Sequence, residues 1–486
     1  METKPDRIPD RIIDIFKQIS TIPRCSRNEG QIARWLSQRT QDMGFENRQD
    51  RVGNLVISVP ASPGYEDGPV VVLQGHMDMV CEKTADSMHD FKKDPISFVF
   101  DGQWLRADRT TLGADNGIAL AIALALVEDK SVAHPPLELL FTMDEETGLT
   151  GANALEPGFV TGKILINIDS EDEGVFTVGC AGGKNTKITV PLFFVEFPET
   201  YIACNIEVNG LRGGHSGIDI HTHRANANKI VGRILNELSY QSPIRLISIH
   251  GGTAHNAIPR SAGAVFVCDG ADFDCLQGIV TEFEKIITQE YAGVETALSV
   301  LFADNGSRTA GSMAVAVEDT QKLIHLLSAL PNGINEMAMG FKGLVETSNN
   351  LARIRTTPDS IEMLSSQRSL VMSRLEEITS RIESIAALAG AAANSEKGYP
   401  AWLPDLESPL LSRCLETYQR LFEQKPRVES IHAGLECGII GDRFENMDMI
   451  SLGPTIKNPH SPEERLHLPS VEKVWTFLVA LLKCYG

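Results

Sequence analysis

Strand and helix patterns alternate at both ends of the chain, and this alternation restricts the fold more than any other feature of the sequence. Helical periodicity is present at 8–18, 29–43, 117–128, 408–423 and 470–485. Short apolar runs typical of buried strands occur at 54–59, 70–75, 137–142, 164–168 and 447–452. The alternation predicts an α/β fold with a mainly parallel sheet covered by helices.

The middle of the chain follows a different pattern, in which strands outnumber helices. Helices are predicted at 225–240, 272–291, 317–330 and 373–392, with strands at 201–209, 244–250, 263–268, 295–302, 345–354 and 360–366. The order of elements recurs, which indicates two α+β halves. A chain of 486 residues is also too long for one core. We therefore expect an α/β domain, formed by residues 1–186 and 399–486, with an inserted α+β domain at 187–398.

Charge and composition exclude several classes of protein. The net charge of −20 disfavours phosphate-binding roles, so neither nucleic acid nor an anionic membrane is an expected partner. No apolar run is long enough to span a bilayer, and the charged N-terminus lacks the apolar core of a signal peptide. The nine cysteines are scattered and form no C-x-x-C pair, which indicates reduced, mostly buried thiols. We expect a cytoplasmic protein.

Acidic residues and histidines follow the predicted strands of the α/β domain. In VVVLQGHMDMV, His76 and Asp78 lie on one face at the end of a strand. The others are Asp115 before a helix, the acidic run 144–146 after a strand, Asp169 after another strand, and His460 in a proline-bracketed loop. Each has an ordinary explanation as a helix cap, a solvated turn or a surface residue. Their shared position at one sheet edge instead indicates a common function.

Clustered carboxylates repel one another unless a cation neutralises them, so this edge is predicted to bind metal. Two imidazoles with several carboxylates and no thiolate favour zinc, cobalt or manganese in a hydrolytic site. Five ligands are too many for one tetrahedral catalytic zinc. They suit two ions that share a bridging carboxylate, roughly 3.5–4 Å apart as in two-metal hydrolases.

Longer motifs connect the chain to a known family. The order G-H-x-D-x-V, G-A-D-N-G, D-E-E-x-G, a strand-end Asp and P-H-S resembles the co-catalytic zinc aminoacylase and carboxypeptidase superfamily. RTTLGADNGIALA, INIDSEDEG, LRGGHSGIDIH, NAIPR, IHAGLECG and GPTIKNPHSPEE are similar to segments of the aminoacyl-histidine dipeptidases (Xaa-His dipeptidase, peptidase D). This resemblance runs over essentially the whole chain in matching order.

The resemblance implies a role for each residue of the cluster. His76 and Asp169 would bind one zinc ion, and Glu146 and His460 would bind the other. Asp115 would bridge the two ions. Glu145 would be the general base, and Asp78 would orient the imidazole of His76. Spacing alone does not decide which of Glu145 and Glu146 is the base and which is the ligand.

The inserted domain resembles the lid of this family, through which relatives dimerise, so we expect a homodimer. His215 would polarise the scissile carbonyl. The substrate-binding residues implied by the resemblance are Asn256, Arg260, Arg368, His432 and Glu436. An arginine would bind the free carboxylate of the substrate, and His432 and Glu436 would meet its amino end. The alternatives are surface ion pairs for the arginines and a glycine-rich loop packed beside the site for 431–438.

The function implied is hydrolysis of unblocked dipeptides, Xaa-His among them, by a hydroxide activated by two zinc ions, with cobalt or manganese as possible substitutes. The alternative within enzymes is an aminoacylase-like or carboxypeptidase-like amidohydrolase that acts on N-acylated amino acids. A binding protein without catalytic activity is a further alternative, which the loss of a ligand or of the base would indicate. None of the seven positions of the cluster is lost here.

Overall fold

The computed structural model describes residues 8–305 and 313–486. Contacts divide the chain into two compact units. Unit 1 contains Met1–Cys180, Trp402–Ser430 and Leu435–Gly486, and unit 2 contains Ala181–Ala401 and Ile431–Gly434. The domain boundaries expected after residues 186 and 398 stay a prediction, which limited proteolysis of the folded protein would check.

Unit 1 is built on an eight-stranded sheet of order β1-β2-β6-β3-β7-β23-β8-β22. The strands are β1 Glu46–Gln49, β2 Leu55–Val59, β3 Val71–His76, β6 Leu137–Thr142, β7 Ile164–Asn167, β8 Val175–Cys180, β22 Arg427–Ile431 and β23 Asp448–Ser451. The four central strands, β6, β3, β7 and β23, run parallel. The pairs β1–β2, β2–β6 and β23–β8 are antiparallel. The α/β fold class is confirmed, with a parallel centre and antiparallel flanks.

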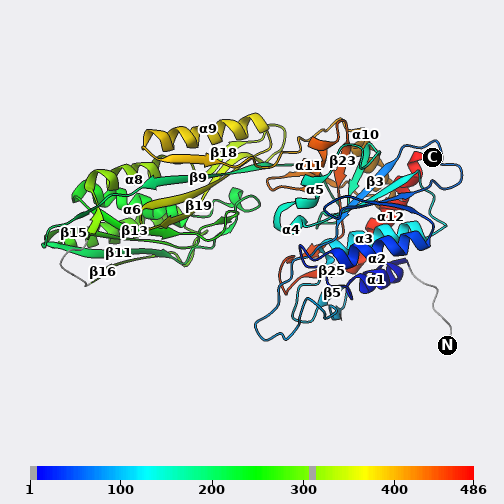
Figure 1. The fold of residues 1–486 in the computed structure, drawn as a ribbon, viewed down its shortest axis with the longest axis horizontal. Helices are drawn as coiled ribbons and strands as arrows, with labels where there is room; N and C mark the ends of the chain where they lie inside the picture. Colours follow the sequence, from blue (N-terminus) through cyan, green and yellow to red (C-terminus); the bar gives the residue numbers. More distant parts are fainter. Residues whose placement is uncertain (1–7, 306–312) are drawn as a thin grey trace. The chain divides into compact units, whose positions relative to one another are not determined.

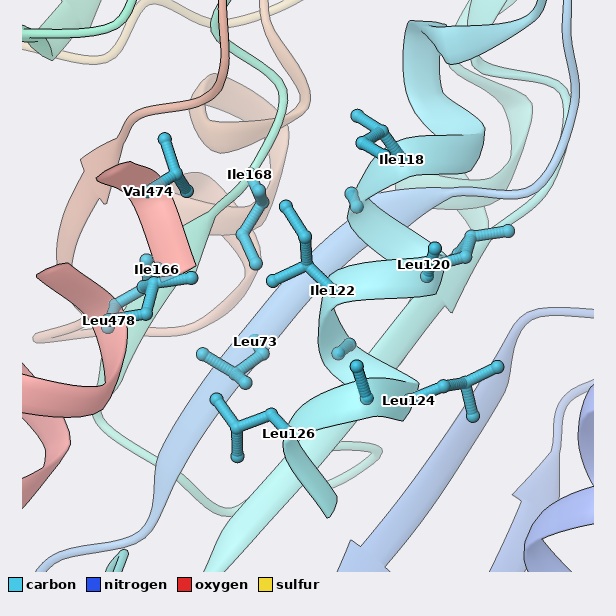
Figure 2. Packing of buried hydrophobic residues seen from close by; sticks show 14 of the residues in the cluster. Leu73, Ile118, Leu120, Ile122, Leu124, Leu126, Ile166, Ile168, Val474 and Leu478 are labelled. Atoms are coloured by element: carbon cyan, nitrogen blue, oxygen red, sulfur yellow. The ribbon is translucent and has the colours of Figure 1, made fainter. Parts of the chain in front are cut away.

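Helices cover this sheet, and they explain why β3 and β6 are buried at every residue. The helices of unit 1 are α1 Ile8–Ile19, α2 Gly30–Asp42, α3 Ala114–Glu128, α4 Glu145–Gly148, α5 Thr150–Ala154, α10 Pro409–Phe422, α11 Glu436–Arg443 and α12 Leu468–Leu482. Helix α3 is apolar on all sides because it packs against β3 on one side and α1 on the other. Figure 2 shows Ile122 and Leu126 pointing toward Leu73 of β3, whereas Leu120 and Leu124 point to the opposite side.

A small second sheet in unit 1 fixes the loop that carries His460. Its order is β24-β25-β5-β4, with β4 Phe98–Asp101, β5 Trp104–Ala107, β24 Ile456–Lys457 and β25 Arg465–His467. Strands β24 and β25 form a hairpin, and β25 pairs with β5. The loop between β24 and β25 is therefore anchored at both ends.

Unit 2 contains a continuous nine-stranded sheet to which both predicted α+β halves contribute strands. Its strands are β9 Gly182–Pro191, β11 Tyr201–Asn209, β13 Arg245–Gly251, β15 Ala262–Asp269, β16 Ser299–Asp304, β18 Gly333–Met337, β19 Val345–Thr356, β20 Ser360–Ser369 and β21 Ala392–Ser395. The two predicted halves join where β13 pairs with β19. Helices α6 Ala227–Gln241, α8 Val317–Ala329 and α9 Met372–Leu388 lie over one face (Figure 1), and α7 is Phe273–Glu290.

The cysteines differ in one respect from the expectation of reduced thiols. Cys25 and Cys81 form a disulfide. The pairing was not visible in the sequence because 56 positions separate the two residues and no short motif marks them. The segment that contains Cys25 runs beside the segment that follows β3. There, Met79 N–H donates to the Arg24 carbonyl at 3.1 Å. Within the described ranges, no helix has the length and apolar character needed to cross a membrane.

Candidate metal centre and substrate-binding residues

The parallel strands of unit 1 bring the predicted ligands to one edge of the sheet. His76 is the last residue of β3, and Glu145 and Glu146 open α4 just after β6. Asp169 lies two residues beyond the end of β7. Because neighbouring parallel strands end on the same side, these residues converge although up to 93 positions separate them in the sequence.

Asp115 lies between the two histidines. Its Oδ1 is 3.1 Å from His76 Nε2, and its Oδ2 is 2.9 Å from His460 Nε2. The same nitrogens face a second carboxylate each, with Asp169 Oδ1 at 3.5 Å from His76 and Glu146 Oε2 at 3.0 Å from His460. Among the candidate metal-binding groups of the described residues are His76 with Asp115 and Asp169, and His460 with Asp115 and Glu146, and within each group the ligand atoms lie within 4.8 Å of one another. Asp115 belongs to both.

The protonation of the cluster fits the binding of cations. Burial acts to lower the pKa of both imidazoles, yet Asp169 and Asp115 raise the pKa of His76 well above its ordinary value. Asp115 and Glu146 raise the pKa of His460 to about 11 against the same effect. Protons on these nitrogens supply the positive charge that the carboxylates require, and a metal ion displaces such protons. Glu146 Oε1 is buried without a hydrogen-bond partner, as expected of a metal-ligand oxygen.

Asp78 organises more than the imidazole of His76. Its Oδ1 lies 3.2 Å from His76 Nδ1, as the H-x-D spacing predicts. The same carboxylate accepts backbone hydrogen bonds from Glu145 N at 3.0 Å and Glu146 N at 3.2 Å, and one from Ser26 Oγ at 2.8 Å. Burial opposes ionisation of Asp78, but the hydrogen bond and the charge of His76, followed by the hydrogen bonds from Ser26 and Glu145 N, lower its pKa to about 2. One carboxylate therefore fixes a histidine and both glutamates.

Glu145, the predicted general base, lies among other carboxylates. Burial raises its pKa well above the ordinary value of a glutamate, and the neighbouring carboxylates act in the same direction. Its carboxylate forms a third close group with His76 and Glu146. A glutamate whose pKa is raised by burial binds an accepted proton more tightly, and it can return that proton to a more basic leaving group.

Glu436 is buried beside the candidate metal centre. Its Oε2 accepts hydrogen bonds from Gln74 Nε2 at 2.6 Å and Thr142 Oγ1 at 2.7 Å, while Oε1 has no partner. Burial raises the pKa of Glu436 to about 7. Gln74 in turn accepts from Asn167, which fixes the orientation of its amide. Hydrogen bonds to Oε2 therefore hold the carboxylate in place, while Oε1 can accept a hydrogen bond from another group.

The remaining predicted residues lie in unit 2. His215 belongs to the short strand β12 Gly214–His215, which pairs with β14 Ala257–Ile258. Its Nδ1 accepts hydrogen bonds from Gly217 N at 3.2 Å and Ile218 N at 3.1 Å. This lone pair is therefore occupied, and the ring proton is on Nε2. Asn256 borders β14, and its carbonyl accepts from Ser216 N at 2.7 Å.

Arg368 and His432 are largely buried, whereas Arg260 is exposed. Arg368 Nη1 donates to the Tyr399 hydroxyl at 2.8 Å, and its Nε has no partner. His432 Nε2 lies 2.7 Å from Ser348 Oγ. Burial and the charge of Arg368 lower the pKa of His432 to about 3, so this imidazole is neutral.

Three buried charged residues beside the cluster were not predicted from the sequence. Glu29 accepts the backbone N–H of Asp144 at 2.9 Å. Arg24 and Glu464 bind the backbone around Asp115 and His76. Their partners are main-chain groups, which leave no trace in residue type or spacing. The only available signal was PHSPEE, which places two glutamates near His460 without indicating that Glu464 is the buried one.

Known proteins resemble this chain over nearly its whole length. The chain is 42% identical over 475 residues to the cytosol non-specific dipeptidase of Escherichia coli (strain K12), covering 98% of this chain and 97% of the relative. The solved structure of aminoacylhistidine dipeptidase from Vibrio alginolyticus matches with a TM-score of 0.89 and 38% identity, over 99% of this chain and 98% of that one. The chain belongs to the aminoacyl-histidine dipeptidase family.

Two further matches concern the fold and not the substrate. A family model described as a peptidase dimerisation domain matches residues 206–295, which lie within unit 2. The structure of aminopeptidase PepT from Bacillus cereus ATCC 10987 has a TM-score of 0.56 at 15% identity, over 98% of both chains, and shows a shared fold. The family and the fold class predicted from the sequence are both confirmed.

Proposed function

We propose that the protein is a metal-dependent dipeptidase that hydrolyses unblocked dipeptides, including Xaa-His dipeptides. The observation that carries the proposal is the position of Asp115, with one carboxylate oxygen facing each histidine and Glu145 in the same cluster. The names of the two relatives, a non-specific dipeptidase and an aminoacylhistidine dipeptidase, support this substrate class over N-acylated amino acids.

The cluster fits two divalent ions, and zinc suits its ligands, with cobalt or manganese as substitutes. His76 and Asp169 would hold one ion, Glu146 and His460 the other, and Asp115 would bridge them. When bound, such ions lower the pKa of a coordinated water and polarise a carbonyl oxygen.

The protein's own groups move the proton and stabilise the developing charge. Glu145 would take a proton from the attacking water and return it to the nitrogen of the leaving amine, a task that its raised pKa suits. Asp78 Oδ1 contacts both the His76 ring and the Glu145 backbone N–H, and it fixes the positions of these two residues relative to each other. His215 would donate a hydrogen bond from its Nε2–H to the oxygen of the scissile carbonyl and so stabilise the negative charge that develops there.

The two ends of an unblocked dipeptide need groups of opposite charge. Glu436 Oε1 would accept a hydrogen bond from the substrate ammonium group. Arg368 and Arg260 would bind the substrate carboxylate, and Asn256 and the neutral His432 would be further substrate-binding residues. An N-acylated amino acid carries no ammonium and would leave Glu436 buried without a counterion.

The match to a peptidase dimerisation domain supports a homodimer formed through unit 2. Size-exclusion chromatography with light scattering should then give a mass twice that of the 53.1 kDa chain. The name of the Escherichia coli relative supports a cytoplasmic location. Nucleic acid and membranes are not proposed as partners, in line with the net charge of −20.

The test is amine release from Ala-His, β-Ala-His, Leu-Leu, a tripeptide and an N-acetyl amino acid, with chelated enzyme and after zinc is restored. We expect zinc-dependent cleavage of the dipeptides and none of the acetylated compound. Cleavage of the acetylated compound alone would overturn the substrate class while retaining the metal chemistry. If no substrate is cleaved with zinc, cobalt or manganese, the dipeptidase proposal fails.

A further inference from the structure

The loop that presents Asp115 is held from two sides by buried charges. On one side, the Glu464 carboxylate accepts four consecutive backbone N–H groups. Oε2 accepts from Leu112 at 2.7 Å and Gly113 at 2.9 Å, and Oε1 accepts from Ala114 at 2.8 Å and Asp115 at 3.3 Å. Only 1% of Glu464 is exposed. Its interaction with the loop is therefore shielded from solvent.

On the other side, the Arg24 guanidinium binds carbonyls of the same loop and of the segment that follows His76. Its Nη2 donates to the Gly113 carbonyl, and its Nη1 donates to the carbonyls of Met77 at 3.1 Å and Asp78 at 2.7 Å. Arg24 is 2% exposed. One planar group thus connects the segment carrying His76 to the loop carrying Asp115.

Two glycines of GADNG provide the space for this guanidinium. A Cβ at Gly113 would lie 2.6 Å from Arg24 Nη2, and a Cβ at Gly117 would lie 2.5 Å from the same atom. Gly113 also has a φ of +68°, which favours glycine. The loop sequence and the arginine are therefore matched to each other.

We propose that Arg24 and Glu464 are positioning residues of the metal centre, which set the place of the Asp115 carboxylate relative to His76 and His460. This inference rests on the proposed function, because it requires that Asp115 binds metal. Glu464 also belongs to the β24–β25 loop that carries His460. The same side chain therefore couples the placement of a candidate bridging ligand to that of a candidate terminal ligand.

The test uses variants that keep the charge, because a change in charge near the site alters cation affinity by itself. Arg24→Lys retains the positive charge but loses the two-pronged contact, and Glu464→Asp retains the carboxylate but shortens its reach. Matched controls are Arg34→Lys and Glu463→Asp, which replace exposed residues of the same types. Circular dichroism selects the folded variants.

Zinc affinity is measured on apo protein by competition with a chromophoric chelator, and kcat and KM are measured separately. We expect each charge-conserving variant to bind zinc about 10–100-fold more weakly, as for other groups that orient metal ligands. kcat should fall with KM little changed, and excess zinc should restore part of kcat. Both controls should match the wild type.

The outcomes separate this inference from the metal proposal. If the wild type does not bind zinc, the metal centre itself is wrong. If the wild type binds two zinc ions and the folded variants bind them with equal affinity, the positioning role is wrong. Should Arg24→Lys fail to fold, Gly113→Ala tests the same contact from the other side, and unchanged zinc affinity there would likewise overturn the inference.

Discussion

At the scale of single residues, two carboxylates of the cluster each contact several partners. Asp115 faces two histidines, and Asp78 fixes one histidine and the backbone of two glutamates. Each carboxylate can do this because it is buried and its two oxygens point to different partners. A substitution at either position should therefore affect several groups at once, whereas Glu145 and Glu436 each allow a narrower test.

Glu145→Gln should lower kcat by about 10²–10⁴-fold, since the amide cannot take the proton of the attacking water. Zinc binding should stay close to that of the wild type, because Glu145 is not among the five proposed ligands. Steady-state kinetics together with zinc titration check this result, with the exposed Glu156→Gln as control. A large loss of zinc affinity in Glu145→Gln would instead make Glu145 the ligand and Glu146 the base.

Glu436 should give the chelated protein a measurable pH dependence. Its pKa rises from an ordinary 4.5 to about 7 in the folded state. The folded state therefore holds this proton more tightly than the unfolded state does. The resulting stability is fully present below pH 4.5 and is lost as the pH rises through 7.

Glu436→Gln removes this dependence. We expect the melting temperature of the variant, relative to the wild type, to increase between pH 5 and pH 8 when both are measured with chelator present. In the zinc enzyme the same variant should raise KM for an unblocked dipeptide. A difference in melting temperature that does not change with pH would show that Glu436 is ionised throughout.

At the scale of elements, the disulfide joins the segment before α2 to the segment after β3. It closes a loop of 56 residues in the unfolded chain. Cys81→Ser should therefore lower the free energy of unfolding by about 2–4 kcal/mol under non-reducing conditions.

Urea unfolding measures this loss, and wild-type protein treated with reductant should unfold like the variant. Cys275→Ser removes an exposed thiol and should have no effect. If reductant leaves the wild type unchanged while the variant is destabilised, the loss comes from packing at position 81 and not from the covalent bond.

The elements show which features a sequence can specify. Strands β3 and β6 and the ligands at their ends could be predicted because buried apolar runs and acidic turns have local signatures. Helix α3 is bounded at Ala114, but Asp115 and Asn116 have non-helical backbone angles, so its regular part begins at the predicted Gly117. Strand β9 was not predicted because it opens with two glycines, whereas β8 was missed although its residues are buried and mostly apolar. Arg24 and Glu464 act on main-chain groups and could be found only in three dimensions.

At the scale of the whole molecule, bound ions should stabilise unit 1 as a body, because the proposed ligands come from segments 76, 115, 146, 169 and 460 of the chain. A ligand present at 100 times its Kd stabilises the folded state by about 2.7 kcal/mol. Chelation should therefore lower the melting temperature of the transition that unit 1 undergoes, and zinc should restore it. Scanning calorimetry with and without chelator checks this, and identical scans would contradict metal binding in unit 1.

The position of β23 has a consequence for the newly made chain. This strand, Asp448–Ser451, lies between β7 and β8 in the middle of the unit 1 sheet. Strands β7 and β8 leave the ribosome early, but the strand that separates them follows only after unit 2 has been synthesised. The sheet stays incomplete until then, and His460 comes later still. A nascent chain therefore cannot assemble both candidate ligand groups before β23 and His460 have been synthesised.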